Sequence, residues 1–311
     1  MPELRWHPLL GEWVAVATQR QERTFFPPDD YCPLCPSKPG GVPTEVPAPT
    51  YDMVVFENKF PSLAPPHGQC EVVLYTPEHD GALADLPVRR IEHLIKVWRD
   101  RTRALHARED VQHVFPFENK GAAIGVTLTH PHGQIYAYPF VPPVVQREIA
   151  QAQAYREREG ACLFCDVREG ERSDGRRIVA EEDGWVAYIP AFARWPYETH
   201  LVPTRCVRDL LALDAAEVRG LARLLRRVLA GFDALFGVPF PYIMAVHQGP
   251  KDDAPYHLHL EFYPPMRSAD KLKFLAGSES GAGMFINDTL AEEKAAELRA
   301  LAPCHPEPVE G

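Results

Sequence analysis

The stretch Thr-His-Pro-His-Gly-Gln at residues 129–134 decides how the rest of this chain is interpreted. In an extended strand alternate residues share a face, so His130, His132 and Gln134 point the same way, with the two histidines roughly 6–7 Å apart. One histidine can therefore hold a metal while the other faces a substrate. The intervening proline and glycine remove bulk from the opposite face and let another backbone approach closely. A pair of core histidines is the alternative, but this stretch is poor core material.

The side chains of His132 and Gln134 suit nucleotide transfer better than hydrolysis. A histidine acts as a covalent nucleophile when one ring nitrogen is neutral and the other is held by a hydrogen bond. Attack by His132 on a nucleotide α-phosphorus would form a phosphoramidate, which stays reactive enough to pass the nucleotide to another phosphate. Gln134 can donate to a phosphoryl oxygen, but it cannot supply the proton that a leaving group needs in hydrolysis.

Cysteines and histidines recur in the same order in both halves of the chain. Four of the seven cysteines form two Cys-x-x-Cys pairs, and in a chain without a secretory signal such pairs indicate metal or redox chemistry. Structural zinc takes four tetrahedral nitrogen or sulfur ligands, so we expect two zinc ions. The expected ligands are Cys32, Cys35, His79 and His130 for the first zinc, and Cys162, Cys165, His200 and His257 for the second.

The repeated order indicates an internal duplication. His79 follows Cys35 by 44 residues and precedes His130 by 51, whereas His200 follows Cys165 by 35 and precedes His257 by 57. One such set could arise by chance, but two sets in the same order argue for two copies of one domain. The remaining thiols, which we expect to be buried or bystanders, are Cys70, Cys206 and Cys304.

Apolar patterning predicts an α+β fold of two similar halves, residues 1–150 and 151–311, each with an antiparallel sheet and a packed helix. The long helices are expected at residues 88–108 and 215–236, the second beginning with an Asp-x-x-Glu capping box, and a last helix is expected from Thr289. The expected strands are residues 53–56, 71–75, 111–115 and 134–140 in the first half, and 185–189, 199–202, 242–246 and 258–263 in the second.

Composition and charge exclude several functions. The net charge of −10 and the lack of a Lys/Arg stripe argue against general nucleic-acid binding, which needs a basic face. There is no run of 18 apolar residues, so no membrane span is expected. The first residues do not form a secretory signal, and we therefore expect a cytoplasmic protein.

A longer stretch around the motif resembles a known family. Residues 117–123 read Phe-Glu-Asn-Lys-Gly-Ala-Ala, Gly125 follows, and the His-Pro-His-Gly-Gln motif comes next. This combination resembles the galactose-1-phosphate uridylyltransferases of the histidine-triad superfamily, which implies that the two halves, residues 1–150 and 151–311, are histidine-triad-like domains. Further matches extend the resemblance to about residues 5–300 and include Cys32-x-x-Cys35, Thr-Pro-Glu-His at 76–79, Phe-Tyr-Pro-Pro at 262–265, and Lys273-Phe274 with Gly277-x-Glu279.

The resemblance implies a ping-pong exchange between UDP-glucose and galactose 1-phosphate. His132 would take the uridylyl group, and Gln134 would hold the phosphoryl oxygens. In the family the sugar is contacted by a segment of the partner subunit, so a homodimer is expected. The substrate-binding residues implied by the resemblance are Arg20, Arg23, Asn58, Asn119, Gly125, Thr127, Lys273, Phe274 and Glu279.

The chain departs from the family at several positions. Some members hold iron in the second half with one glutamate and three histidines, of which Glu148, His247 and His259 have counterparts here, while Glu261 replaces the third histidine. Because the second Cys-x-x-Cys pair is kept, we expect zinc there rather than iron. The family's sugar-contacting tyrosine is Ser278, and Lys59 stands where other members carry an acidic residue.

Two alternative functions remain open. An ADP-sugar or dinucleotide phosphorylase of the same superfamily would use the same histidine through an adenylyl intermediate. A non-catalytic nucleotide-binding scaffold would keep the fold and the zinc sites without chemistry. The context of the His-Pro-His-Gly-Gln motif and the segment 273–279 favour uridylyl transfer.

Overall fold

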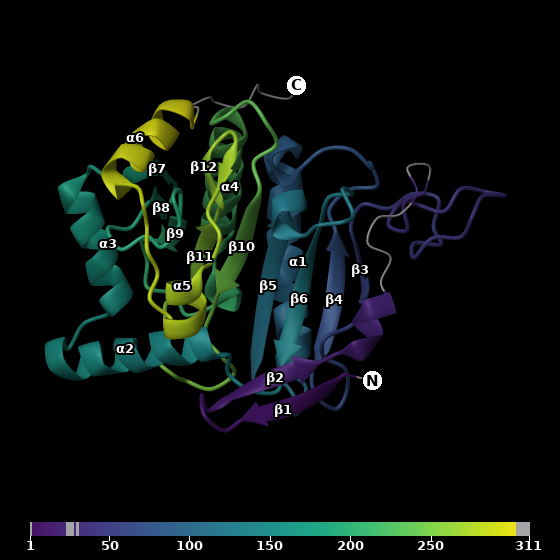
Figure 1. Cartoon of the computed structure of the whole chain (residues 1–311), viewed down its shortest axis with the longest axis horizontal. Coiled ribbons are helices and arrows are strands. Elements are labelled where there is room, and N and C mark those ends of the chain that lie inside the picture. The colour runs from purple at the N-terminus through teal and green to yellow at the C-terminus, as the bar shows by residue number, and fades with distance from the viewer. Residues whose placement is uncertain (1, 23–27, 29–30, 303–311) are drawn as a thin grey trace.

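The protein is built on one nine-stranded antiparallel sheet (Figure 1). The computed structural model describes residues 2–22, 28 and 31–302. The strand order is β3-β4-β6-β5-β10-β11-β9-β8-β7. The bounds are β3 (Val54–Glu57), β4 (Gln69–Leu74), β5 (His113–Lys120), β6 (His132–Tyr138), β7 (Ile178–Glu182), β8 (Trp185–Tyr188), β9 (Thr199–Pro203), β10 (Tyr242–His247) and β11 (His259–Tyr263).

The strand order confirms the predicted duplication. The strands β5 and β10 pair at the centre, with Asn119 opposite Ile243. Outward from this pair the order β5, β6, β4, β3 is matched by β10, β11, β9, β8. His130 and His257 each lie two residues before the corresponding strand, β6 or β11. The two halves thus share a single sheet, and the central strand pair joins them.

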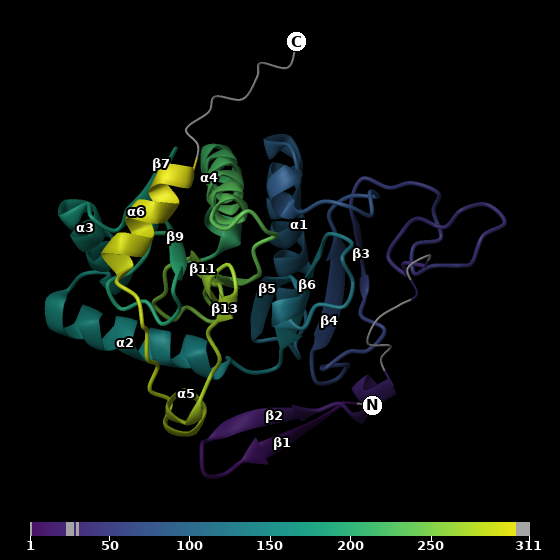
Figure 2. The same ribbon diagram turned by 45° about the horizontal axis from the view of Figure 1, so that its top comes forward.

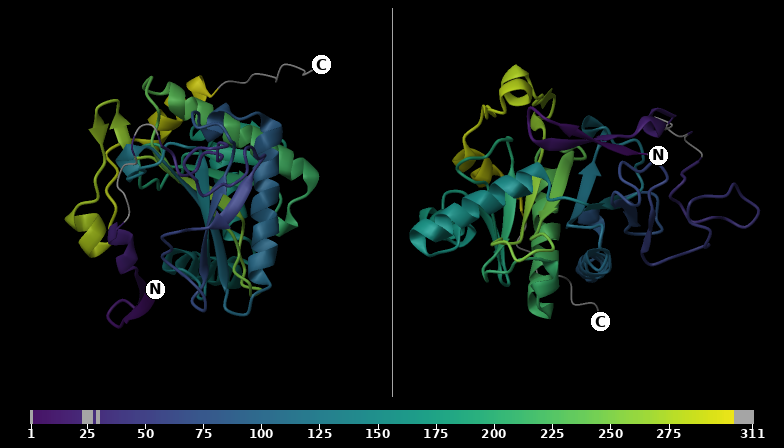
Figure 3. Two further views of the ribbon diagram at one scale, coloured as in Figure 1. Left: turned by 90° about the vertical axis from the view of Figure 1, so that its right-hand side faces the viewer. Right: turned by 90° about the horizontal axis from the view of Figure 1, so that it is seen from below.

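Two long helices, α1 (Val88–His106) and α4 (Ala215–Ala234), cover one face of the sheet side by side (Figure 3). Their apolar sides, including Trp98 and Phe232, are buried in the main core. The predicted capping box is present, since Asp214 accepts from the Glu217 backbone N–H and Glu217 accepts from the Asp214 backbone N–H. Both predicted helices are therefore confirmed.

Three further helices surround the second half (Figure 2). They are α2 (Pro143–Glu159), α3 (Leu163–Asp174) and α6 (Ala291–Leu301). The last was expected from Thr289, whereas α2 and α3 were not expected. Cys162 is the N-cap of α3, so the second cysteine pair opens a helix. None of the helices in the described part of the chain is long and apolar enough to cross a bilayer.

The other face of the sheet is only partly covered. A hairpin of β1 (Glu3–His7) and β2 (Glu12–Val16) lies on this side, followed by the 3-10 helix η1 (Thr18–Glu22). The segment with β12 (Met266–Ser268), β13 (Lys271–Leu272) and α5 (Gly277–Ala282) lies on the same side, opposite α1 and α4 (Figure 3). His132 and Gln134 of β6 and Phe115 and Phe117 of β5 are half-buried on this face, which carries the candidate site.

Candidate functional site

The strand β6 presents His132 and Gln134 on the open face. Burial alternates along the strand, with Gly133 and Ile135 buried toward the helices and the flanking His132 and Gln134 half-buried. His132 lies opposite Leu74 of β4, and Gln134 is paired with Val72 of β4 and Phe117 of β5. The shared face expected from the period of a strand is therefore present, and neighbours on both sides hold its register.

A backbone hydrogen bond sets the tautomer of His132. Its Nδ1 lies 2.7 Å from the carbonyl oxygen of His130. A carbonyl can only accept, so Nδ1 carries the proton and donates it. The lone pair of the neutral ring is then on Nε2, which is the state that a histidine nucleophile requires.

A second hydrogen bond orients the amide of Gln134. The Asn58 side-chain amide donates to Gln134 Oε1 at 3.1 Å, and Asn58 Oδ1 accepts from the backbone N–H of Phe60 at 2.9 Å. Because Gln134 Oε1 is engaged with Asn58, the Gln134 NH2 group is turned outward as a donor. Such a pre-oriented donor suits a phosphoryl oxygen on His132.

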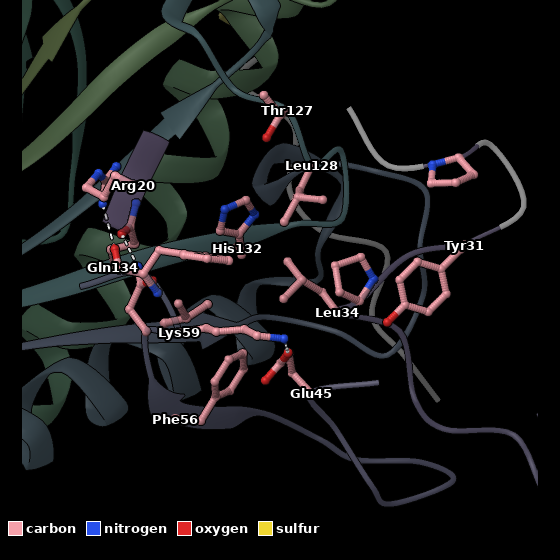
Figure 4. A pocket seen from close by; sticks show the side chains of 15 residues that line it. Arg20, Tyr31, Leu34, Glu45, Phe56, Lys59, Thr127, Leu128, His132 and Gln134 are labelled. Carbon is pink, nitrogen blue, oxygen red and sulfur yellow. Dashed lines mark hydrogen bonds and ion pairs between the residues drawn. The ribbon is translucent and has the colours of Figure 1, made fainter. Parts of the chain in front are cut away.

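These residues line a cavity of about 290 Å³ (Figure 4). One wall is apolar, and the other carries charged and amide side chains beside His132. Arg20 belongs to the polar wall, where its guanidinium donates to the Phe60 carbonyl at 2.8 Å and to Ser62 Oγ at 3.2 Å. The cavity is lined by Arg20, Pro28, Tyr31, Pro33, Leu34, Glu45, Phe56, Asn58, Lys59, Phe60, Val72, Thr127, Leu128, His132 and Gln134.

The other substrate-binding residues implied by the sequence that the structure describes are not among those lining this cavity. Asn119 lies on β5 and Gly125 ends a short 3-10 turn with a left-handed φ of 81°. Arg23 lies outside the described residues. The residues of the 273–279 segment are not brought to the cavity within one chain, because Lys273 and Glu279 pair with each other at 3.1 Å and are buried there. Phe274, by contrast, is 75% exposed.

A buried polar network packs against β6 on the face of the sheet opposite His132 and Gln134. Glu118 accepts hydrogen bonds from the hydroxyls of Tyr75 and Tyr242, both at 2.9 Å. The Tyr75 hydroxyl also fills the space beside Gly133, where any Cβ would clash with it. Burial raises the pKa of Glu118 to about 7, against the opposing effect of the two tyrosine hydrogen bonds. Gly133 is thus required by close approach, and the network braces the strand between His132 and Gln134.

The first predicted zinc set comes together in the structure. Cys32, Cys35, His79 and His130 place their ligand atoms within 4.8 Å of one another. Cys35 Sγ lies 3.4 Å from Nδ1 of His79 and 3.6 Å from Nδ1 of His130. Zinc bonds of about 2.3 Å to sulfur and 2.0–2.1 Å to nitrogen, at a tetrahedral angle, separate the two atoms by about 3.5 Å. The donor set therefore fits zinc.

The second set needs one correction. Cys162, Cys165 and His257 come together, but the fourth member is Cys206, not His200. Nδ1 of His257 lies 3.6 and 3.5 Å from the two sulfurs of the pair, and Cys206 Sγ lies 3.8 Å from Cys162 Sγ. Two Zn–S bonds at a tetrahedral angle separate the sulfurs by about 3.8 Å, so this set fits zinc as well.

A signal in the sequence could have identified Cys206. It follows Cys165 by 41 residues and precedes His257 by 51, close to the spacings of 44 and 51 in the first set. His200 cannot serve because it lies on β9, where its Nε2 is 3.1 Å from Glu198 and 3.4 Å from Glu261. The structure therefore places Cys206, which we expected to be a buried or bystander thiol, beside the second cysteine pair.

His200 belongs to a third polar cluster, which is formed by buried residues of the second half together with Glu148 of α2. One group is Glu198, His200 and Glu261, and an adjoining group is Glu148, His247 and His259. Glu261 links them, since its carboxylate lies 3.4 Å from His200 and 3.3 Å from His259. Burial opposes protonation of His259, but its hydrogen bonds to the carboxylates of Glu148 and Glu261 raise its pKa to about 10. The second cysteine set and this glutamate–histidine cluster are thus two separate groups of side chains, not alternative ligands for one metal ion.

Fold and site together define a duplicated histidine-triad-like protein with a histidine-lined pocket on one half of its sheet. Residues 62–142 match the family model for the N-terminal domain of galactose-1-phosphate uridyl transferase, and residues 148–309 match the model for its C-terminal domain. The chain belongs to the galactose-1-phosphate uridylyltransferase family.

Individual members of this family align with almost the whole chain. The galactose-1-phosphate uridylyltransferase of Thermotoga maritima is 40% identical, and the alignment covers 96% of this chain and 98% of the relative. The enzyme of the same name from Streptomyces lividans is 41% identical over 97% of this chain and 88% of its own. A solved uridylyltransferase structure superposes with a TM-score of 0.86 at 33% identity, covering 97% of this chain and 98% of the other.

Proposed function

We propose that the protein transfers UMP from UDP-glucose to galactose 1-phosphate in two steps through a uridylyl group on His132. The observation that carries the proposal is the pairing of a tautomer-fixed His132 with an outward-turned Gln134 amide at one cavity. Family membership supports the same reaction. The neutral glutamine favours transfer to a second sugar phosphate over hydrolysis by water.

Each side chain has one role in this reaction. Nε2 of His132 attacks the α-phosphorus, the bond to the β-phosphate oxygen breaks, and glucose 1-phosphate leaves with that electron pair. The Gln134 amide donates to the α-phosphoryl oxygens as their charge grows. A phosphate oxygen of galactose 1-phosphate then attacks the same phosphorus, and the P–N bond breaks to return neutral His132. Arg20 and Asn58 line the polar wall where the phosphates would lie.

Two structural zinc ions form part of the proposal. The corrected ligand sets are Cys32, Cys35, His79 and His130 in the first half, and Cys162, Cys165, Cys206 and His257 in the second. Each set supplies four ligands and leaves no coordination position for substrate, so zinc would hold loops in place and take no part in the chemistry. Burial and the neighbouring Cys32 raise the pKa of Cys35 to about 11, so a cation is needed to keep both thiolates there.

A homodimer completes the proposal. The segment with Lys273, Phe274 and Glu279 would contact the sugar bound to the partner, because it does not reach the cavity of its own chain. Exposed apolar side chains on this segment and on the hairpin support such a contact, with Phe274 75%, Met284 69% and Leu9 88% exposed. We retain domains of residues 1–150 and 151–311, and a cytoplasmic location that keeps the thiolate ligands reduced.

Incubation with radiolabelled UDP-glucose alone tests the function. The expected result is an acid-labile uridylyl label at His132 and release of glucose 1-phosphate. Label from ADP-glucose, with none from UDP-glucose, would indicate the adenylyl alternative. Absence of label from both, with nucleotide binding intact, would indicate a non-catalytic scaffold.

A further inference from the structure

An ion pair lies at the wall of the His132 cavity. Lys59 Nζ is 3.1 Å from Glu45 Oε1, and both residues line the cavity. Figure 4 shows the two side chains reaching toward each other below His132. The side chain of Glu45 is 33% exposed and that of Lys59 is 65% exposed, so the pair is accessible from the cavity.

The two partners come from segments that the fold holds firmly. The backbone N–H of Glu45 donates to the Pro33 carbonyl at 2.9 Å, and the Thr44 hydroxyl donates to the Cys35 carbonyl at 2.7 Å. Glu45 is therefore attached to the cysteine knuckle of the first metal set. Lys59 directly follows Asn58, the residue that orients Gln134. The pair thus has a set position between the knuckle and the polar end of the cavity.

A carboxylate is electrostatically unfavourable in a pocket that binds a doubly charged diphosphate, unless it accepts a hydrogen bond from the ligand. Two negative charges repel, and a neighbouring ammonium reduces that cost without removing it. Among the described contacts only Oε1 of Glu45 has a partner, which leaves Oε2 to accept from a ligand. A nucleotide offers two adjacent donors in the 2′- and 3′-hydroxyls of its ribose. The uracil N3–H, in contrast, is flanked by two carbonyl oxygens that would repel the carboxylate.

The order of groups in a nucleotide agrees with this position. A phosphate on His132 is followed by the ribose and then by the base, which the apolar wall around Leu34 and Phe56 suits. We propose that Glu45, oriented and neutralised by Lys59, accepts hydrogen bonds from the ribose hydroxyls and so selects ribonucleotides over 2′-deoxyribonucleotides. Carboxylates perform this recognition in dinucleotide-binding folds. The inference rests on the proposed function, since it places the nucleotide at His132.

A comparison of UDP-glucose with its 2′-deoxyuridine analogue tests the inference. The rate of His132 labelling at subsaturating substrate is measured for the wild type, Glu45→Ala and Lys59→Met. The wild type should prefer the ribose form by about 10- to 100-fold, as expected for a hydrogen bond to a charged group. Both variants should lose most of this preference, with a larger loss for UDP-glucose than for the deoxy analogue, which keeps only its 3′-hydroxyl.

Controls separate recognition from folding. Glu57→Ala removes an exposed carboxylate from β3 outside the cavity lining and should keep the wild-type preference. Zinc content and melting temperature report whether Glu45→Ala disturbs the knuckle, and Lys59→Met breaks the pair from another segment. Equal losses on both substrates in the two variants would overturn the inference, while labelling at saturating UDP-glucose would leave the proposed function standing.

Discussion

The two halves of the sheet contain the same hydrogen bond between a histidine ring and the backbone, but the histidine is half-buried in one half and fully buried in the other. His132 at the start of β6 bonds the carbonyl of His130 through Nδ1 at 2.7 Å, and His259 at the start of β11 bonds the carbonyl of His257 in the same way at 2.9 Å. The first histidine is half-buried beside a cavity, whereas His259 is 2% exposed. A single backbone arrangement therefore presents one histidine to a ligand and hides the other.

The neighbouring side chains decide what each histidine can do. Two residues after His132 stands neutral Gln134, and two residues after His259 stands Glu261. Nε2 of His259 lies 3.3 Å from Glu261 and 3.8 Å from Glu148, which favour its protonated form. A protonated or metal-bound ring has no lone pair for attack. Duplication thus provided two equivalent positions, and side-chain charge left only one of them suited to a nucleophile.

The largest expected difference between the halves comes from removing each histidine. His132→Gly should abolish the uridylyl label and both half-reactions, a loss of several orders of magnitude, because His132 is the one histidine among the described residues that line the cavity. His259→Ala should still become labelled, although its melting temperature should fall because buried carboxylates lose a partner. Full labelling of His132→Gly would mean that another residue, such as His130, carries the chemistry.

The second test separates the two interpretations of the metal set in the second half. Cys206→Ser should reduce zinc from two ions per chain to one and lower the free energy of unfolding by roughly 3–5 kcal/mol. His200→Gln should keep two zinc ions, since that side chain lies in the carboxylate cluster. Elemental analysis and thermal melts check both variants. Retention of zinc by Cys206→Ser together with its loss from His200→Gln would restore the original ligand prediction.

Changing the residue two positions after His132 sharpens the comparison. Gln134→Ala removes one donor to the transferring phosphoryl group and should cost roughly 2–4 kcal/mol in the labelling step, measured by rapid quench. Gln134→Glu makes β6 resemble β11 and should slow labelling further, because a carboxylate repels the phosphate. A rate for Gln134→Glu equal to that of the wild type would show that the charge at this position is unimportant.

The smallest effect concerns the buried network that braces β6. The pKa of Glu118 is raised from its ordinary 4.5 to about 7, so between these values the folded chain holds a proton that the unfolded chain has released. Its contribution to the free energy of unfolding is therefore present at low pH and lost as pH rises toward 7, by up to about 3 kcal/mol.

Glu118→Gln tests that pH dependence. The variant should show a flatter stability between pH 4.5 and 7 than the wild type, measured by urea unfolding at several pH values. The exposed residue Glu57 supplies the control, since Glu57→Gln should leave the pH dependence unchanged. An identical slope in Glu118→Gln and wild type would exclude this carboxyl as its source.

Local features of the sequence were enough for the central motif and much of the fold. A strict period of two placed His132 and Gln134 on one face, and periodicity with a capping box located α4. Cysteine pairs three residues apart identified both knuckles. These features depend on neighbours in the chain, so propensity and spacing determine them without knowledge of the rest of the molecule.

Only the tertiary structure decided which distant residues meet. Cys206 and His200 are six residues apart in sequence. The course of the chain after β9 brings the sulfur of Cys206 to the second cysteine pair, whereas the pleat of β9 directs His200 toward Glu198 and Glu261. The ion pair of Glu45 and Lys59 likewise joins two loops. Lys273 finds its partner in Glu279 rather than in the cavity of its own chain. Contacts between distant segments depend on sheet order and register, which no local pattern encodes.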